Sequence, residues 1–182
     1  LAILVAGSLD EDDYRTRREA DFYDVKGAVE AVFERLRVPG FTFERVGVEY
    51  LHSGQAAAVV ADGQVLGVFG RLSPELAARR KFKQPVFVAQ IALNRLLELE
   101  PAAFSYRRLP RFPSVVRDLS IVVPRAVGLA EIQSTVTGLG IAELVDVALY
   151  DIFSGGQLGE GHHSVTLRAT FRGDDRTLTD DE

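Results

Sequence analysis

The segment SVTLRATFR, residues 164–172, alternates strictly between polar and apolar residues. Successive side chains of a β-strand point to opposite faces, so this pattern predicts a strand with one buried face and one open face. The predicted buried set, facing the helices, is Val165, Leu167, Ala169 and Phe171. The predicted open set is Ser164, Thr166, Arg168, Thr170 and Arg172. The strand therefore belongs to a sheet that helices cover on one side only.

The residues before this strand complete a β-α-β-β order. RDLSIVV (117–123) reads as a strand with Leu119, Ile121 and Val123 on one face, and a helical stripe then ends near Gly140. The members of that stripe are Leu129, Ile132, Val136 and Leu139. LVDVALYDIF (144–153) reads as a further strand, with Val145, Val147 and Leu149 as its core set. Tyr150 then falls on the open face unless a bulge intervenes.

The two ends of the chain favour an internal fragment of a longer polypeptide, or a chain with a missing tail. Thr179 is followed three residues later by Glu182, the spacing of a capping box that opens a helix. With that helix, the order β-α-β-β-α is a ferredoxin-like split β-α-β domain without its last strand. Residues 1–6 read as a strand already under way, and the chain contains no methionine.

The first hundred residues predict an α+β unit with a mainly antiparallel sheet. A helix is expected from Asp24 to Val38, and a hairpin is expected around the turn dipeptide Asp62-Gly63. PVFVAQIAL (85–93) reads as a buried strand. Prolines at 101, 110 and 113 then favour an extended tether. The predicted division is a first domain of 1–100, a linker of 101–111 and a second domain of 112–182.

Composition limits the classes of function. The chain has 182 residues with 47% apolar and 26% charged residues, a net charge of −5 and no cysteine. This balance is that of a globular protein, and it argues against a globally basic nucleic-acid binder, a membrane span and thiolate chemistry. A cytoplasmic location is the expectation. The stretch 101–128 is locally cationic, with arginines at 107, 108, 111, 117 and 125 against Asp118 alone. Charge alone favours a solvated linker whose arginines maintain solubility.

The predicted open face combines an aromatic ring with arginines. Tyr150 beside Arg168 and Arg172 is a pattern that holds single-stranded nucleic acid by stacking and phosphate contact. A solvated sheet face with one exposed tyrosine accounts for the same pattern equally well. The residues alone leave the two interpretations open.

Several segments resemble a known family. RFPSVVRDLSIVV, LYDIFSGGQLGEGHHSVTLRATFR and RTLTDDE are similar to the C-terminal ferredoxin-like anticodon-binding domain of the bacterial phenylalanyl-tRNA synthetase β subunit. ADFYDVKGAVEAVF and LHSGQAAAVVADGQVLGVFGRLSPEL resemble the end of the catalytic-like module of that subunit. The implied fold class is α+β: a portion of a degenerate class II synthetase-like antiparallel sheet, then a ferredoxin-like split β-α-β domain truncated at its C-terminus.

The resemblance implies a function without a local active site. The enzyme of that family is an (αβ)2 heterotetramer that joins phenylalanine to its tRNA with ATP and Mg2+, and its chemistry resides in the α subunit. This chain would carry no catalytic residue, metal or cofactor of its own. It would bind the anticodon stem-loop of tRNA(Phe) and support α/β assembly. Tyr150 would stack on a base, Arg168, Arg172, Arg117 and Arg176 would contact phosphates, and the 154–163 loop would approach the RNA.

The adjacent histidines invite a metal interpretation that the spacing disfavours. His162 and His163 lie in a predicted hairpin between two inner strands, and neighbouring strand residues point to opposite faces. They cannot easily share one metal ion, which needs three or more directed ligands. The family that the chain resembles generally carries a basic pair or His-Lys at this position, so a neutral pair weakens the expectation of a permanent phosphate clamp. Stacking on a base or pH-dependent phosphate contact stays open.

Three features of the first domain have structural interpretations. His52 is expected to bond to backbone, Asp24 and Lys26 to open a helix, and GVFGRL (67–72) to serve packing rather than phosphate binding. Interaction with an α subunit is the open alternative for Asp24 and Lys26, and a remnant substrate pocket is the alternative for His52. The alternative function is a purely structural subunit-interaction module in which Phe22, Tyr23 and Phe69 are buried against a partner. A zinc hydrolase using the histidines is a third hypothesis.

Overall fold

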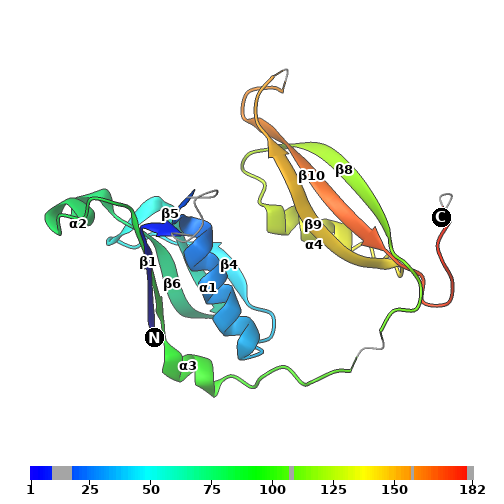
Figure 1. The fold of residues 1–182 in the computed structure, drawn as a ribbon, viewed down its shortest axis with the longest axis horizontal. Coiled ribbons are helices and arrows are strands. Elements are labelled where there is room, and N and C mark those ends of the chain that lie inside the picture. The colour runs from blue at the N-terminus through cyan, green and yellow to red at the C-terminus, as the bar shows by residue number, and fades with distance from the viewer. Residues whose placement is uncertain (10–17, 107–108, 157, 180–182) are drawn as a thin grey trace. The chain divides into compact units, whose positions relative to one another are not determined.

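The computed structural model describes residues 1–9, 18–106, 109–156 and 158–179. The chain divides into two compact units, Leu1–Ser105 and Tyr106–Glu182, and each is built on its own antiparallel sheet (Figure 1). Residues 107, 108 and 180–182, which include two of the predicted linker arginines and most of the predicted final helix start, lie outside the described residues. In the described part of the chain, no helix is long and apolar enough to cross a membrane.

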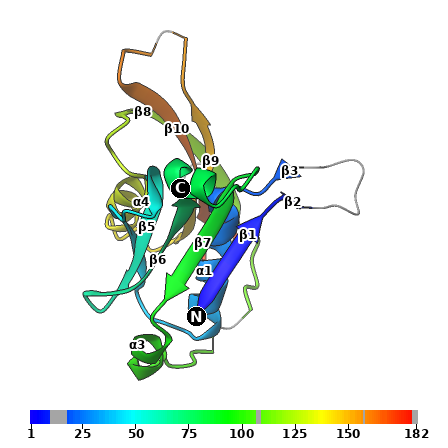
Figure 2. The ribbon, with the colours of Figure 1, turned by 90° about the vertical axis from the view of Figure 1, so that its left-hand side faces the viewer.

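The first unit is a five-stranded sheet with α1 (Phe22–Arg35) on one face. The strands follow the order β1 (Ala2–Ala6), β7 (Val86–Ile91), β6 (Gln64–Leu72), β5 (Leu51–Ala61) and β4 (Thr42–Arg45). Figure 2 shows β1, β7, β6 and β5 with α1 behind them. Two short helices, α2 (Pro74–Arg79) and α3 (Leu93–Glu98), and a small pair, β2 (Ser8–Leu9) with β3 (Arg18–Glu19), complete the unit. The mainly antiparallel α+β prediction is confirmed.

The start of α1 lies earlier than predicted. Asp21, rather than Asp24, is the N-cap: its side chain accepts hydrogen bonds from the amides of Tyr23 and Asp24. Asp24 closes the capping box by accepting from the Asp21 amide at 2.8 Å. Arg18 donates two further hydrogen bonds to the Asp24 carboxylate, which lower the pKa of Asp24 to about 2. Asp24 is thus a structural residue, as predicted.

The apolar face of α1 forms the core of the unit. Val25, Val29 and Phe33 are fully buried against Leu66 and Phe69 of β6. Phe22 stacks on Phe69 with ring centroids 5.4 Å apart. The predicted partner-facing role is wrong for Phe69, because the unit's own core buries it, whereas Phe22 is only partly buried and Tyr23 is 73% exposed.

The hairpin of β5 and β6 forms as the sequence predicts. Asp62 and Gly63 both have positive φ, 49° and 67°, which is the backbone of the tight turn favoured between antiparallel strands. The glycines of GVFGRL serve close packing: a Cβ on Gly70 would lie 2.2 Å from the Gln55 carbonyl oxygen, and one on Gly67 would lie 2.7 Å from that of Gln90. The packing interpretation of this segment is confirmed.

His52 and Lys26 also have local partners. Nδ1 of His52 accepts a hydrogen bond of 3.0 Å from the Gly54 amide, which confirms the expected bond to backbone. Lys26 pairs with Glu30 one turn later, and its ammonium lies 4.6 Å from the centroid of the Phe43 ring. Both side chains stabilise the unit itself.

The second unit has the split β-α-β arrangement. Its elements are β8 (Val115–Pro124), α4 (Leu129–Thr137), β9 (Leu144–Phe153) and β10 (His162–Phe171), with sheet order β8-β10-β9. The ferredoxin-like prediction is confirmed for these elements. The predicted position of the hairpin is wrong, however, since β9 lies at an edge of the three-stranded sheet and only β10 is inner.

A small core joins α4 to one face of this sheet. Ile132, Val147, Val165 and Leu167 are buried together, and Gln133 of α4 donates a 2.7 Å hydrogen bond to the Val147 carbonyl. The predicted core residue Val145 is exposed instead. The pairing between β9 and β10 shifts register there, so Leu144 pairs with Phe171 and packs against the core in its place.

Gly70→Ala is expected to lower the free energy of unfolding of the first unit by about 1–3 kcal/mol, because the methyl group would overlap the Gln55 carbonyl. Gly27→Ala is the matched control, since Gly27 lies in α1 with open space around it, and this change should instead raise stability by about 0.5–1 kcal/mol. Denaturant unfolding measures both. Equal effects of the two changes would contradict the close-packing account.

Candidate nucleic-acid interface

The face of the second sheet that α4 leaves open carries polar cross-strand pairs. Asp118 lies opposite Arg168, and Ser120 lies opposite Thr166 with their hydroxyl oxygens 2.8 Å apart. Ser164 lies opposite Val122 of β8 and Phe153 of β9. The open set predicted from the alternation of β10 is therefore on the face predicted for it.

A register shift in β9 determines which aromatic residues reach this face. Leu149 pairs with Leu167 and Asp151 pairs with Thr166, so Tyr150 is an extra residue without a partner in the ladder. This is the bulge left open by the sequence pattern. Tyr150 still reaches the open face, where its ring lies 3.8 Å from the guanidinium carbon of Arg168. The ring is stacked by a cation, and the residue is 57% exposed.

Arg168 is held between Tyr150 and Asp118. Its Nε and Nη2 donate to the two carboxylate oxygens of Asp118, both at 2.8 Å. These hydrogen bonds lower the pKa of the Asp118 carboxyl and raise the pKa of Arg168, which interacts with Tyr150 as well. Much of the guanidinium charge is thereby compensated within the sheet. Arg168 therefore serves to position the Tyr150 ring, and little of its charge is left to bind a phosphate.

Phe153 is a second exposed aromatic on the open face, and the sequence pattern missed it. Counted by alternation from Tyr150, Phe153 would point to the helix side. The extra residue at Tyr150 reverses this, so that Phe153 pairs with Ser164 and is 55% exposed. A side chain at Gly156 would approach the Phe153 ring to 3.8 Å, so the glycine loop passes close to it. Only the observed pairing of Phe153 with Ser164 shows that Phe153 lies on the open face.

The two adjacent histidines lie on opposite faces of β10. His163 pairs with Val123 on the helix side, and in the described part of the chain its Nε2 is buried without a hydrogen-bond partner. His162 is on the open side, and its Nδ1 lies 3.1 Å from the carbonyl oxygen of Glu160. Within the described ranges, no three His, Asp or Glu side chains are grouped to hold a metal ion. Only His162 lies on the face of Tyr150.

The remaining predicted arginines are distributed differently. Arg117 pairs with Ala169 on the helix-side face, away from Arg168, and its Nη1 donates to the Val116 carbonyl at 3.3 Å. The alternation of Leu119, Ile121 and Val123 already implied that face. Arg176 lies beyond the last strand, where its carbonyl would meet a side chain at Gly173. The structure therefore does not bring Arg117 to the open face.

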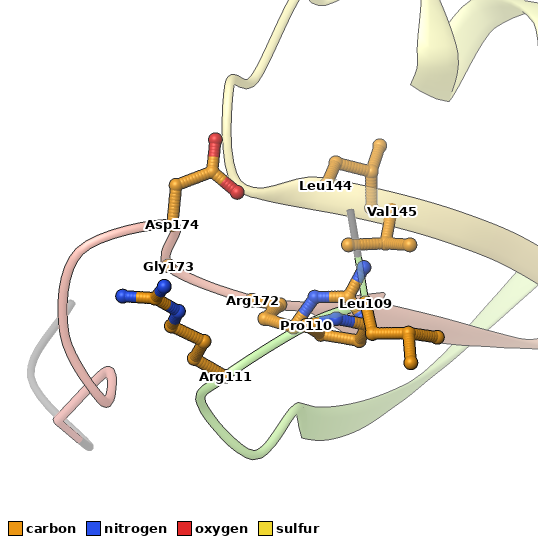
Figure 3. A pocket seen from close by; sticks show the side chains of 8 residues that line it. All are labelled: Leu109, Pro110, Arg111, Leu144, Val145, Arg172, Gly173 and Asp174. Atoms are coloured by element: carbon orange, nitrogen blue, oxygen red, sulfur yellow. The ribbon is translucent and has the colours of Figure 1, made fainter. Parts of the chain in front are cut away.

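Arg172 contributes to a hollow at the end of the sheet remote from the hairpin loop. The hollow has a volume of about 630 Å³ and is lined by Leu109, Pro110, Arg111, Leu144, Val145, Arg172, Gly173 and Asp174. Figure 3 shows the guanidinium of Arg111 on the side of Asp174 and that of Arg172 on the side of Leu109. The backbone amide of Arg172 donates to the Glu143 carbonyl at 2.8 Å and fixes this corner. Two cations against one carboxylate favour a singly charged anion.

Comparison with known proteins agrees with this geometry. Residues 110–182 match the family model of the ferredoxin-fold anticodon binding domain, so the second unit is a domain of that class. Residues 1–93 match the phenylalanyl tRNA synthetase beta chain CLM domain. The chain therefore belongs to the phenylalanyl-tRNA synthetase β chain family.

Its relatives are β subunits of phenylalanine–tRNA ligase. The protein of Symbiobacterium thermophilum is 37% identical over 165 residues, which are 91% of this chain and 18% of the relative. The protein of Geobacter sulfurreducens is 34% identical over 163 residues, 89% of this chain and 20% of the relative. The protein of Bacillus cereus strain ATCC 14579 is 33% identical over 167 residues, 91% of this chain and 21% of the relative. The chain thus spans about a fifth of the length of these relatives.

The Asp118 carboxyl should titrate below its ordinary pKa of about 3.9. Because folding lowers this pKa, the pair with Arg168 contributes its stability fully above the ordinary pKa and loses it as the pH falls through the folded value. The measurement is the carboxyl carbon shift of Asp118 by NMR. In Arg168→Gln the titration should return to the ordinary range. An unchanged titration in that variant would contradict the assigned pair.

Proposed function

We propose that the open face of β8, β10 and β9 binds the single-stranded loop of the tRNA(Phe) anticodon stem-loop. The supporting observation is the presence of two exposed aromatic rings, Tyr150 and Phe153, on one polar face of an anticodon-binding fold. Unpaired bases stack on such rings, whereas a paired helix presents no free base faces to them. Tyr150 and Phe153 are three residues apart on β9, or up to about 10 Å along the strand. Each ring can therefore take its own base.

The polar residues between these rings suit the edges of splayed bases. Ser164 and Thr166 lie in the rows of Phe153 and Asp151, so hydroxyl donors and acceptors stand beside each stacking position. His162, at the hairpin end of the same face, can donate to a phosphate or stack on a base. The hollow of Arg111 and Arg172, at the opposite end, is suited to one backbone phosphate. Contributions of His163, Arg117 and Arg176 would have to come from outside this face.

The wider assignment follows from the family. We propose that the first unit is the C-terminal portion, about 1–100, of a non-catalytic class II synthetase-like module, joined by a 101–111 linker to the anticodon-binding domain of 112–182. The whole enzyme would be an (αβ)2 heterotetramer in the cytoplasm that uses ATP and Mg2+, with catalysis in the α subunit. The described residues would supply recognition and assembly rather than chemistry.

A purely structural role in α/β assembly is the second candidate. Tyr23 supports it, since this aromatic side chain is 73% exposed on α1, while Phe22 is partly buried and Phe69 is buried. In that case Tyr23→Ala should reduce co-purification with an α subunit in the absence of tRNA. Unchanged co-purification would leave the exposed tyrosine without a role in assembly.

Tyr150→Ala and Phe153→Ala should each weaken binding of an anticodon stem-loop RNA by about 1–3 kcal/mol, the usual loss of one base stack. Ile152→Ala is the matched control, because Ile152 pairs with Val165 on the helix side of the same strand and is also exposed. Binding is measured by fluorescence anisotropy, with a fully paired hairpin as the control RNA. Equal losses for all three variants would sink the open-face assignment.

Substitutions of Arg168 and Arg172 should have different effects on RNA affinity and on its salt dependence. Arg172→Gln removes a cation proposed to contact phosphate, so the slope of log K against log salt should flatten by about 0.7 for a single strand. Arg168→Gln frees Tyr150 from its stack, so affinity should fall with little change of slope. The reverse pattern would contradict the role of Arg168 as a positioning residue.

A further inference from the structure

The turn that ends α2 carries the densest positive charge of the first unit. Residues 79–83 read RRKFK, four cations in five residues without an acid, and all of them are exposed. Arg79 lines a small hollow with Glu49 and Glu75, and Glu75 precedes it by one helical turn, so its charge is partly compensated. Among the described residues, Arg80, Lys81 and Lys83 have no ion-pair partner.

The backbone of this turn has a common helix C-terminal geometry, but Lys81 occupies the position where glycine is usual. The amide of Lys81 donates to the Ala78 carbonyl and that of Phe82 to the Ala77 carbonyl, both at 3.0 Å. Lys81 has a φ of 58°, in the left-handed region where glycine is the usual residue. A lysine at this position costs local strain that a glycine would avoid.

The end of α1 provides a comparison within the same chain. Arg37 has a φ of 54°, and the amides of Arg37 and Val38 make the corresponding bonds to Glu34 and Phe33. One cation at a helix C-terminus is explained by the helix dipole. The residue that follows the left-handed position differs between the two helix ends. After α1 it is Val38, which is buried at 7% exposure, whereas after α2 it is Phe82, which is 47% exposed. The dipole explains neither the extra cations of α2 nor its exposed ring.

We propose that this basic turn, Arg80 to Lys83, binds an RNA sugar-phosphate backbone, with Phe82 stacking on a base. Exposed cations around an aromatic ring are the combination that holds single-stranded RNA. A lipid surface would need a longer amphipathic helix than the six residues of α2. An acidic protein segment would be held by the cations but would not require the ring. The turn lies outside the anticodon-binding unit, so this RNA contact is additional to the open face and does not depend on it.

The test compares two triple variants of the 182-residue chain in binding to a full-length tRNA(Phe) transcript. Arg80→Gln, Lys81→Gln and Lys83→Gln together should flatten the salt dependence of log K by roughly 2–3, since each lost phosphate contact removes about 0.7–0.9. The control triple is Arg35→Gln, Arg45→Gln and Arg95→Gln, which removes the same charge from dispersed exposed positions. It should change the slope by less than half as much. Equal slopes for the two triple variants would overturn the proposal.

Two further measurements distinguish the basic turn from the open face, and RNA from an acidic protein partner. In a Tyr150→Ala plus Phe153→Ala background, the slope difference between the triple variants should persist, so failure of the open face would not remove it. A polyglutamate peptide tests the protein alternative. Loss of peptide binding with unchanged tRNA binding in the turn variant would overturn the RNA assignment.

Lys81→Gly tests the strain argument in a variant that folds. Glycine relieves the left-handed backbone, so the melting temperature should rise while the salt slope for tRNA falls by about 0.7–0.9. A rise in stability with an unchanged slope would contradict a contact between Lys81 and RNA.

Discussion

The register shift at Tyr150 is the constraint on which the proposed interface depends. A strand has a side-chain period of two, so one extra residue exchanges the faces of every residue on one side of it. In β9 the shift places both Tyr150 and Phe153 on the open face, although simple alternation would separate them. Arg168 then fills the space over the Tyr150 ring, and Asp118 holds the guanidinium from the next strand. Contacts within the sheet itself therefore position the aromatic face.

The open face carries little uncompensated charge. The chain carries a net charge of −5, and the most central arginine of the sheet is paired with a carboxylate. Binding through the open face would then rest on stacking and base-edge contacts, with a phosphate contact at the Arg111 and Arg172 hollow. The basic turn after α2 would add the sequence-independent attraction that the sheet itself lacks. The open face would then recognise the bases of the loop, and the basic turn would attract the RNA backbone.

Much of the fold could be predicted from the sequence because local signals determine it. The alternation of residues 164–172 and the Asp62-Gly63 turn each specify their own backbone. The two register shifts of β9 could not be predicted, because a bulge depends on which residues of β10 lie opposite. Val145, expected in the core, and Phe153, not predicted for the open face, are both consequences. Asp21 was missed as the cap of α1 because Asp24 is equally suitable by type, and only the hydrogen bonds distinguish them.

The most direct test of the central claim is an NMR titration of the chain with an anticodon stem-loop RNA. The account predicts that shift changes cluster on the open-face residues of β9 and β10, above all Tyr150, Phe153, Ser164 and Thr166, with intermolecular contacts from both rings to bases. Residues of α4 such as Ile132 and Gln133, on the opposite face, should be unaffected. Shift changes confined to α4, or absent from the second unit while RNA still binds, would contradict it.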